Sequence, residues 1–193
     1  MGNHNQVGFF ATAKLAASAC LLLSGCGQVS VPSQAIFHPR GTAALHASEL
    51  NPASMPIREK IYIPVYSSIH WSGRNVVTEL SATISIRNAD ARNPLVLSAV
   101  TYYDSLGKPI QEYLDGVMEL DPMATVEFVI ERPDTRGGSG ANFIVEWASP
   151  VEIAEPVTES IMLGQIGNAG ISFSSPGRTI RIVDVPGQAT QVP

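Results

Sequence analysis

Nine residues in the middle of the chain, Glu79 to Arg87, alternate without exception between polar and apolar side chains. Successive side chains of a strand point to opposite faces, so this pattern predicts a strand with one buried and one solvated face. Strands of this kind are typical of antiparallel sheets. The apolar face must be covered by a second layer, and this requirement constrains the fold more than any other segment does.

Comparable short patterns recur from residue 60 onward, separated by turn signals, and no long amphipathic helix interrupts them. They are Ile61–Tyr66, Leu95–Tyr103, Ile110–Leu114, Ala124–Glu131, Phe143–Trp147, Ile171–Phe173 and Ile180–Ile182. Pro64 has no N–H for a ladder and predicts an edge position for its strand. Val157–Ile166 fits a strand or a short helix. The pattern predicts an all-β fold, an antiparallel immunoglobulin-like β-sandwich of about seven or eight strands, with a partly open barrel as the alternative.

The first 25 residues have the parts of a bacterial export signal. Lys14 precedes a nine-residue apolar run, Leu15–Leu23, which is shorter than the roughly 20 residues that cross a bilayer. The next residues complete Leu-Ser-Gly-Cys at Cys26, which resembles the bacterial lipobox. That resemblance implies a thioether-linked lipid on Cys26, cleavage before it and acylation of the new amino terminus. Two or three acyl chains hold a protein on a membrane far more firmly than one.

Four segments follow from these observations. Residues 1–25 are the predicted lipoprotein signal peptide, and residues 26–59, rich in Pro, Gly, Ser and Ala, are predicted to be a lipidated cysteine and flexible tether. Residues 60–184 are the predicted β-sandwich domain, and residues 185–193 read as a disordered tail.

Composition excludes several classes of function. Cleavage before Cys26 leaves no free thiol, because Cys20 is removed and Cys26 is lipidated, so the domain must fold without a disulfide. Loss of Lys14 takes the net charge from −5 to −6. The acidic residues are scattered and no basic stripe appears, which argues against a nucleic-acid partner.

Catalytic and metal-binding patterns are weak. His70 is the single histidine of the predicted domain, and the Gly-x-Ser-x-Gly context of serine hydrolases is absent. The glycine-rich run 137–140 lacks phosphate-loop spacing and predicts a flexible hairpin loop. Asp115, Glu119 and Asp121 lack EF-hand spacing, and a solvated turn is the simpler interpretation. We therefore expect no cofactor, no metal and no enzymatic activity, with a hydrolase of envelope polymers as the alternative.

The segment from His70 to Arg74 is the candidate binding loop. Trp71 lies between His70 and Arg74 in the sequence, and Trp and Arg are enriched among the energetically important residues of interfaces. The alternative is that Trp71 packs into the end of the domain as core. Trp147 differs, because it shares a strand face with Phe143 and Val145 and is therefore predicted to be buried.

Three stretches together resemble a bacterial family known only as a domain of unknown function, which is often found behind a lipobox. They are Ile61–Ser67, Gly138–Trp147, and Gly170–Phe173 with Gly177-Arg178, and the resemblance covers about Lys60 to Ile180. It brings no activity or catalytic residue. The sequence predicts a lipid-anchored cell-envelope protein facing the periplasm or the cell exterior. We expect its domain to bind or scaffold an envelope protein or polymer.

Overall fold

The structure, a computed structural model, describes residues 39–72, 76–132 and 134–180. All of them belong to one compact unit, Ile36–Pro193, whereas a second unit, Met1–Ala35, lies outside the described residues. The predicted signal peptide, Cys26 and tail 185–193 also lie outside them. Within the described residues, no helix is long and apolar enough to cross a membrane.

The described chain is almost entirely strand, in accordance with its alternating patterns. The strands are β1 (Leu45–Ala47), β2 (Ile57–Pro64), β3 (Ser68–His70), β4 (Val77–Arg87), β5 (Leu95–Tyr103), β6 (Pro109–Glu112), β7 (Met118–Leu120), β8 (Thr125–Ile130), β9 (Asn142–Ser149), β10 (Val157–Ile166), β11 (Ala169–Pro176) and β12 (Arg178–Ile180). Three short 3-10 helices accompany them: η1 (Thr42–Ala44), η2 (Pro52–Ser54) and η3 (Gly138–Gly140). The described residues contain more strands than the predicted seven or eight, because several short strands lack a clear alternation in the sequence.

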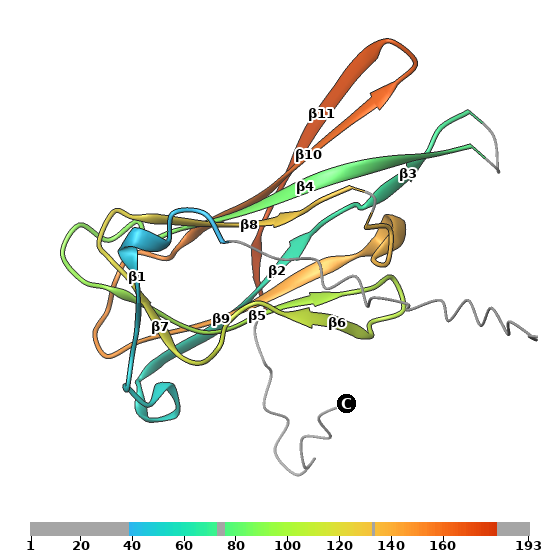
Figure 1. The fold of residues 1–193 in the computed structure, drawn as a ribbon. Helices are drawn as coiled ribbons and strands as arrows, with labels where there is room; N and C mark the ends of the chain where they lie inside the picture. The colour runs from blue at the N-terminus through green and yellow to red at the C-terminus, as the bar shows by residue number, and fades with distance from the viewer. Residues whose placement is uncertain (1–38, 73–75, 133, 181–193) are drawn as a thin grey trace, which may run out of the picture. The chain divides into compact units, whose positions relative to one another are not determined.

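Two antiparallel sheets pack against each other, which confirms the predicted β-sandwich (Figure 1). The seven-stranded sheet has the order β1-β7-β5-β9-β2-β12, with β6 also paired to β5. The five-stranded sheet has the order β11-β10-β4-β3, with β8 also paired to β4. The chain crosses from the second sheet to the first between β11 and β12, so neighbours in sequence lie in different layers.

The core lies between the sheets and follows the predicted alternation. Leu80, Ala82, Ile84 and Ile86 of β4 are all at most 1% exposed. They pack in one cluster with residues of the facing sheet, which include Ile61, Ile63, Leu95, Leu97, Phe143, Val145 and Trp147. Trp147 is 3% exposed, which confirms its predicted place in the core.

The stretch predicted as a flexible tether joins the fold from Arg40 onward. Arg40 exchanges two backbone hydrogen bonds with Glu127, and β1 pairs with β7 in the first sheet. Leu45, which is isolated in the sequence, is buried in the core. The tether prediction is therefore wrong for residues 40–59, because a lone apolar residue can be buried when its backbone extends an existing sheet.

The prediction that Pro64 places its strand at a sheet edge is also wrong. β2 lies between β9 and β12. Its pairing with β12 covers only residues 60–62, so the ladder on that side has ended before Pro64, the last residue of the strand. The missing N–H of Pro64 therefore interrupts no bond to β12.

Val157–Ile166, which fitted a strand or a short helix, forms β10 and lies between β11 and β4. Gly167, with φ of 58°, begins the tight turn to β11, a position that suits glycine. Figure 1 shows that the β10–β11 hairpin and the β3–β4 hairpin project from the rest of the sandwich. We call these two hairpins the arms.

The glycine-rich loop predicted to be flexible is instead folded and tied to its neighbours. It forms η3, and the Ser105 hydroxyl donates to the carbonyl of Gly137 at 2.7 Å and accepts from the N–H of Gly140 at 2.9 Å. A Cβ at Gly137 would lie only 1.9 Å from the Tyr102 hydroxyl oxygen. Glycine is therefore required by close packing at that position.

Candidate binding surfaces

The predicted binding loop lies at the end of one arm. His70 pairs with Val77, and the N–H of Trp71 donates to the carbonyl of Val76 at 2.7 Å. Arg74, the third predicted residue, lies outside the described residues. The hairpin thus brings Val76 and Val77 beside the predicted pair, and we call His70, Trp71, Val76 and Val77 the tip patch.

The tip patch is strongly exposed for its composition. Trp71 and Val76 are each 49% exposed and Val77 is 50% exposed. The alternative that Trp71 packs into the core therefore does not hold. Exposed single apolar residues are ordinary, but Trp71 and Val76 are joined across a projecting hairpin, and Val77 adds exposed apolar area at the next position, so the hairpin end is a candidate contact surface.

A second candidate surface is a groove of about 670 Å³ beside η2, β2, β9 and β12. Its volume is in the range of small-molecule sites. The residues that line it are Pro52, Ala53, Arg58, Glu59, Lys60, Ser98, Glu146, Trp147, Ala148, Thr179 and Ile180. Segments far apart in the sequence therefore form one hollow, which we call the outer groove.

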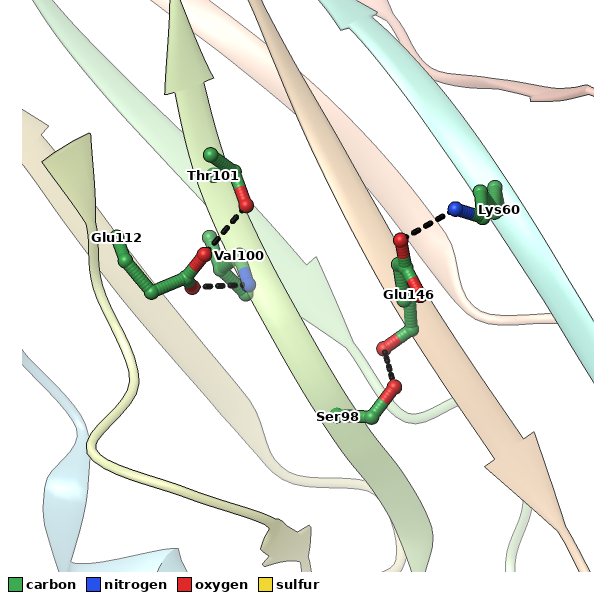
Figure 2. Close-up of polar contacts among 6 residues, drawn as sticks. All are labelled: Lys60, Ser98, Val100, Thr101, Glu112 and Glu146. Atoms are coloured by element: carbon green, nitrogen blue, oxygen red, sulfur yellow. Dashed lines mark hydrogen bonds and ion pairs between the residues drawn. The ribbon is translucent and has the colours of Figure 1, made fainter. Parts of the chain in front are cut away.

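A β-bulge in β5 shapes this hollow. Leu97 lies opposite Trp147 and Ala99 lies opposite Glu146, so Ser98 is an extra residue in the strand. Its hydroxyl donates to the backbone carbonyl of Glu146 at 3.2 Å (Figure 2). Bulges commonly re-aim side chains near functional sites, and this one turns Ser98 toward the groove.

The charged side chains of the groove are partly paired. The Lys60 ammonium donates to the Glu146 carboxylate at 2.5 Å, and both side chains are 38% exposed (Figure 2). A pair this exposed adds about 0–1 kcal/mol to stability. Arg58 is exposed and makes no ion pair within the described residues. The groove therefore presents a mixed surface with one cation available to a ligand.

The nearby carboxylate of Glu112 has a structural role. It accepts from the N–H of Val100 at 2.8 Å and from the Thr101 hydroxyl at 2.5 Å (Figure 2). These bonds join the end of β6 to β5, where the ladder between the two strands is short. The Glu112 carboxylate therefore joins two strands beside the groove, and both of its oxygens already accept hydrogen bonds.

Two carboxylates line the outer groove, but they belong to opposite faces of the sheet. Glu59 lies opposite Trp147, and Lys60 lies opposite Glu146, so Glu59 and Glu146 occupy alternate positions of the pleat. The Oε2 atom of Glu59 and the Nε1 atom of Trp147 are buried and make no hydrogen bond within the described residues. The groove thus has polar atoms beneath its wall but no pair of carboxylates that converge on one point.

No group of three metal-ligating side chains gathers in residues 39–72, 76–132 and 134–180. Asp121, one of the carboxylates considered for calcium, instead lies 3.2 Å from the His46 ring nitrogen. Glu119 lies opposite His46 in the β1–β7 ladder. These carboxylates therefore lie where β7 and the residue after it contact β1.

Comparison with known proteins gives a family but no activity. Residues 58–180 match the family described as "Protein of unknown function (DUF3124)". No curated protein matches the chain. A solved structure described as "Crystal Structure of Thermotoga maritima 1070" is 16% identical, with a TM-score of 0.40, and the match covers 63% of this chain and 92% of that one. Because the family match spans most of the chain, including nearly all of the sandwich, the protein belongs to the DUF3124 family.

Proposed function

We propose that this protein is a lipid-anchored cell-envelope protein whose β-sandwich binds an envelope protein or polymer through the tip patch. The observation that carries the proposal is the 49% exposure of Trp71, which is bonded across the hairpin to the equally exposed Val76, with the exposed Val77 next in the strand. Large aromatic side chains supply contact area at low entropic cost, because they have few rotatable bonds. An arm that projects from the sandwich offers that area without rearrangement of the core.

The anchoring part of the proposal is supported by the sequence. The short apolar run Leu15–Leu23, the small residues after it and Cys26 match the lipobox arrangement. Gly27 follows the cysteine where some proteobacteria place Asp to retain lipoproteins in the inner membrane. By that family-level rule the protein would be sorted outward in a host with an outer membrane.

Anchoring is tested with the Cys26→Ser chain in cells fed radiolabelled palmitate. We expect the label and the membrane association of the chain to be lost, because the acyl chains have no attachment site. Cys20→Ser is the matched control and should keep both. Equal labelling of the Cys26→Ser chain and the unaltered chain would contradict the proposal.

Binding is tested by photo-crosslinking in intact cells, with a photoreactive phenylalanine analogue in place of Trp71. The matched control carries the same analogue at Val151, which is 48% exposed and lies between β9 and β10. We expect a dominant adduct from position 71 that is absent from position 151. Identical adduct patterns from both positions would remove the tip patch as a specific binding surface.

The alternative function, a hydrolase of envelope polymers, receives less support from the geometry. Retaining and inverting glycosidases use two carboxyl groups that flank one bond. Glu59 and Glu146 lie on opposite faces of the sheet. His70 makes no hydrogen bond to a serine among the contacts of the described residues. Binding is therefore the function that we propose.

A further inference from the structure

β11 is an unprotected edge strand. It pairs with β10 on one side, and no strand of the described residues pairs with its other side. Natural edge strands are commonly blunted by charged residues, proline or bulges. β11, with the sequence Ala-Gly-Ile-Ser-Phe-Ser-Ser-Pro, has no charged residue and a regular register, and its proline stands at the last position. The strand is therefore open to pairing along most of its length.

The register shows which backbone groups face outward. The N–H of Gly177 donates to the carbonyl of Thr158 at 2.8 Å, one step beyond the last regular pairs of the ladder. Hydrogen-bonded and non-hydrogen-bonded pairs alternate along an antiparallel ladder, so the odd-numbered residues of β11 bond to β10. Gly170, Ser172 and Ser174 consequently direct their N–H and C=O groups to the open side.

We propose that this edge pairs antiparallel with β11 of a second copy of the chain, about a twofold axis at Ser172. In that register, Ser172 lies opposite the partner's Ser172, and Gly170 lies opposite the partner's Ser174. Each outward residue exchanges two hydrogen bonds with the residue opposite. The two five-stranded sheets then become one continuous sheet with no open edge between them.

The side chains of β11 are self-complementary in this register. Ile171 lies opposite the partner's Phe173, and Phe173 lies opposite the partner's Ile171. Both residues are half-buried in one chain, on the face toward the core, and the Tyr66 ring contacts Phe173 edge-on at 5.7 Å between centroids. A second copy would cover the remaining apolar surface of Ile171 and Phe173 with the same two residue types.

Charge also favours a second copy as the occupant. Identical strands brought face to face repel when they are charged, but β11 carries no charge. Glu159 of β10, the nearest acidic residue in the ladder, is already paired with Arg87 at 2.7 Å. The adjoining outer face of β10 adds the exposed apolar residues Ile161 and Leu163, at 37% and 51%. A basic or acidic peptide would find no complementary charge at this edge.

The proposed axis is tested with the full chain carrying Ser172→Cys. Opposed residues of a hydrogen-bonded pair have Cα atoms about 5.5 Å apart, which a disulfide can span. We expect mild oxidation to give a covalent dimer that reductant reverses. Ser174→Cys is the matched control, because the two copies of that residue would lie about 14 Å apart along the strands and should not join. The unaltered chain, with Cys20 and Cys26, gives the background.

The oligomeric state is tested by light scattering during size-exclusion chromatography of the full chain in detergent. We expect the protein mass to be twice that of one chain. Ser172→Lys should reduce it to one chain, because the two added ammonium groups would face each other across the axis. Thr83→Lys adds the same charge two strands from the edge and should remain dimeric. The Cys26→Ser chain should also remain dimeric, so dimerisation and anchoring are tested separately.

Several results would overturn the proposal. One is a single-chain mass for the unaltered protein at every concentration tested. Another is equal crosslinking of Ser172→Cys and Ser174→Cys, which would place the contact elsewhere or show random collision. A dimer that persists in Ser172→Lys would also exclude this edge. Crosslinking of Ser172→Cys to a different protein in cells would replace the second copy with that partner.

Discussion

The two ends of β4 differ in how they are held. At its C-terminal end, Asn88 is 2% exposed and is fixed by several hydrogen bonds. At its N-terminal end, Val77 is 50% exposed and Trp71 of the adjoining β3–β4 turn is 49% exposed. Both ends pair antiparallel with their neighbours, but Val77 lies on the outward face of β4, with Glu79 and Ser81, whereas Asn88 continues the inward side of Ile84 and Ile86. The difference in exposure therefore follows from the face of the strand that each residue occupies and from what packs against that face.

The Asn88 end is stabilised by hydrogen bonds between the Asn88 side chain and backbone groups of neighbouring segments. The Asn88 side-chain amide donates to the carbonyls of Asn93, Leu120 and Asp121, at 2.9–3.1 Å, and its oxygen accepts from the N–H of Asp90. One side chain thus joins the loop after β4 to the end of β7. Buried backbone carbonyls at a sheet end require such partners.

The tip patch has no comparable set of bonds. Within the described residues, no side chain of the tip patch forms a hydrogen bond to another element, and β3 and β4 are joined by their own backbone ladder. The arm therefore presents apolar area that contributes little to stability. This division predicts that substitutions at the core and at Asn88 change stability, whereas substitutions at the tip patch change binding.

Trp147→Ala tests the buried core and should cause the largest loss of stability. Trp147 is 3% exposed in the central cluster, and removal of a buried aromatic side chain costs about 3–5 kcal/mol. That is a large share of the roughly 5–15 kcal/mol that stabilises a typical domain. We expect urea denaturation to show a severe loss of stability or no folded baseline. A midpoint equal to that of the unaltered chain would show that Trp147 is not core.

Asn88→Ala should have the next largest effect. The substitution leaves the carbonyls of Leu120 and Asp121 without their side-chain donor, and each buried unsatisfied group costs about 1–3 kcal/mol. Asn88→Asp is the matched control, because it keeps the acceptor for Asp90 but loses the donors. We expect both variants to be destabilised in urea melts. An unchanged Asn88→Ala melt would mean that water satisfies these carbonyls.

The elements that the sequence predicted best are those whose pattern is local. The alternation of Glu79–Arg87, the shared face of Phe143–Trp147 and the strand option for Val157–Ile166 are all realised. Each of these predictions depends only on the two-residue alternation within one segment. The resemblance to an uncharacterised family is confirmed separately by the family match. The fold class therefore follows from the local pattern alone.

The features that the sequence missed depend on register between distant segments. Lys60 and Glu146 are 86 residues apart, and nothing in either segment specifies that they pair across β2 and β9. Leu45 appeared isolated because β1 is short and its partner β7 is equally short. Lys60 immediately precedes one predicted strand and Glu146 lies in another, but without the register between the strands their opposite charges could not be matched.

Low pH should weaken the Asn88 end selectively. The backbone N–H groups of Arg92 and Asn93 donate to the Asp90 carboxylate and lower its pKa from 3.8 to about 2. Because the folded pKa lies below the unfolded one, the stabilisation is complete above about pH 4 and is lost as the pH falls toward 2. We expect the melting-temperature difference between the unaltered chain and Asp90→Asn to shrink over that range. A constant difference would contradict this role of Asp90.

Trp71→Ala should have the smallest effect on stability, although the residue is as large as Trp147. About half of its surface is already in water, and its backbone N–H bond to Val76 survives the substitution. Surface substitutions without buried partners usually change stability by about 0.5 kcal/mol or less. We therefore expect a urea midpoint close to that of the unaltered chain, measured in parallel with Trp147→Ala. A loss comparable to that of Trp147→Ala would mean that Trp71 packs onto the fold, and the tip patch would then be part of the structure and not a binding surface.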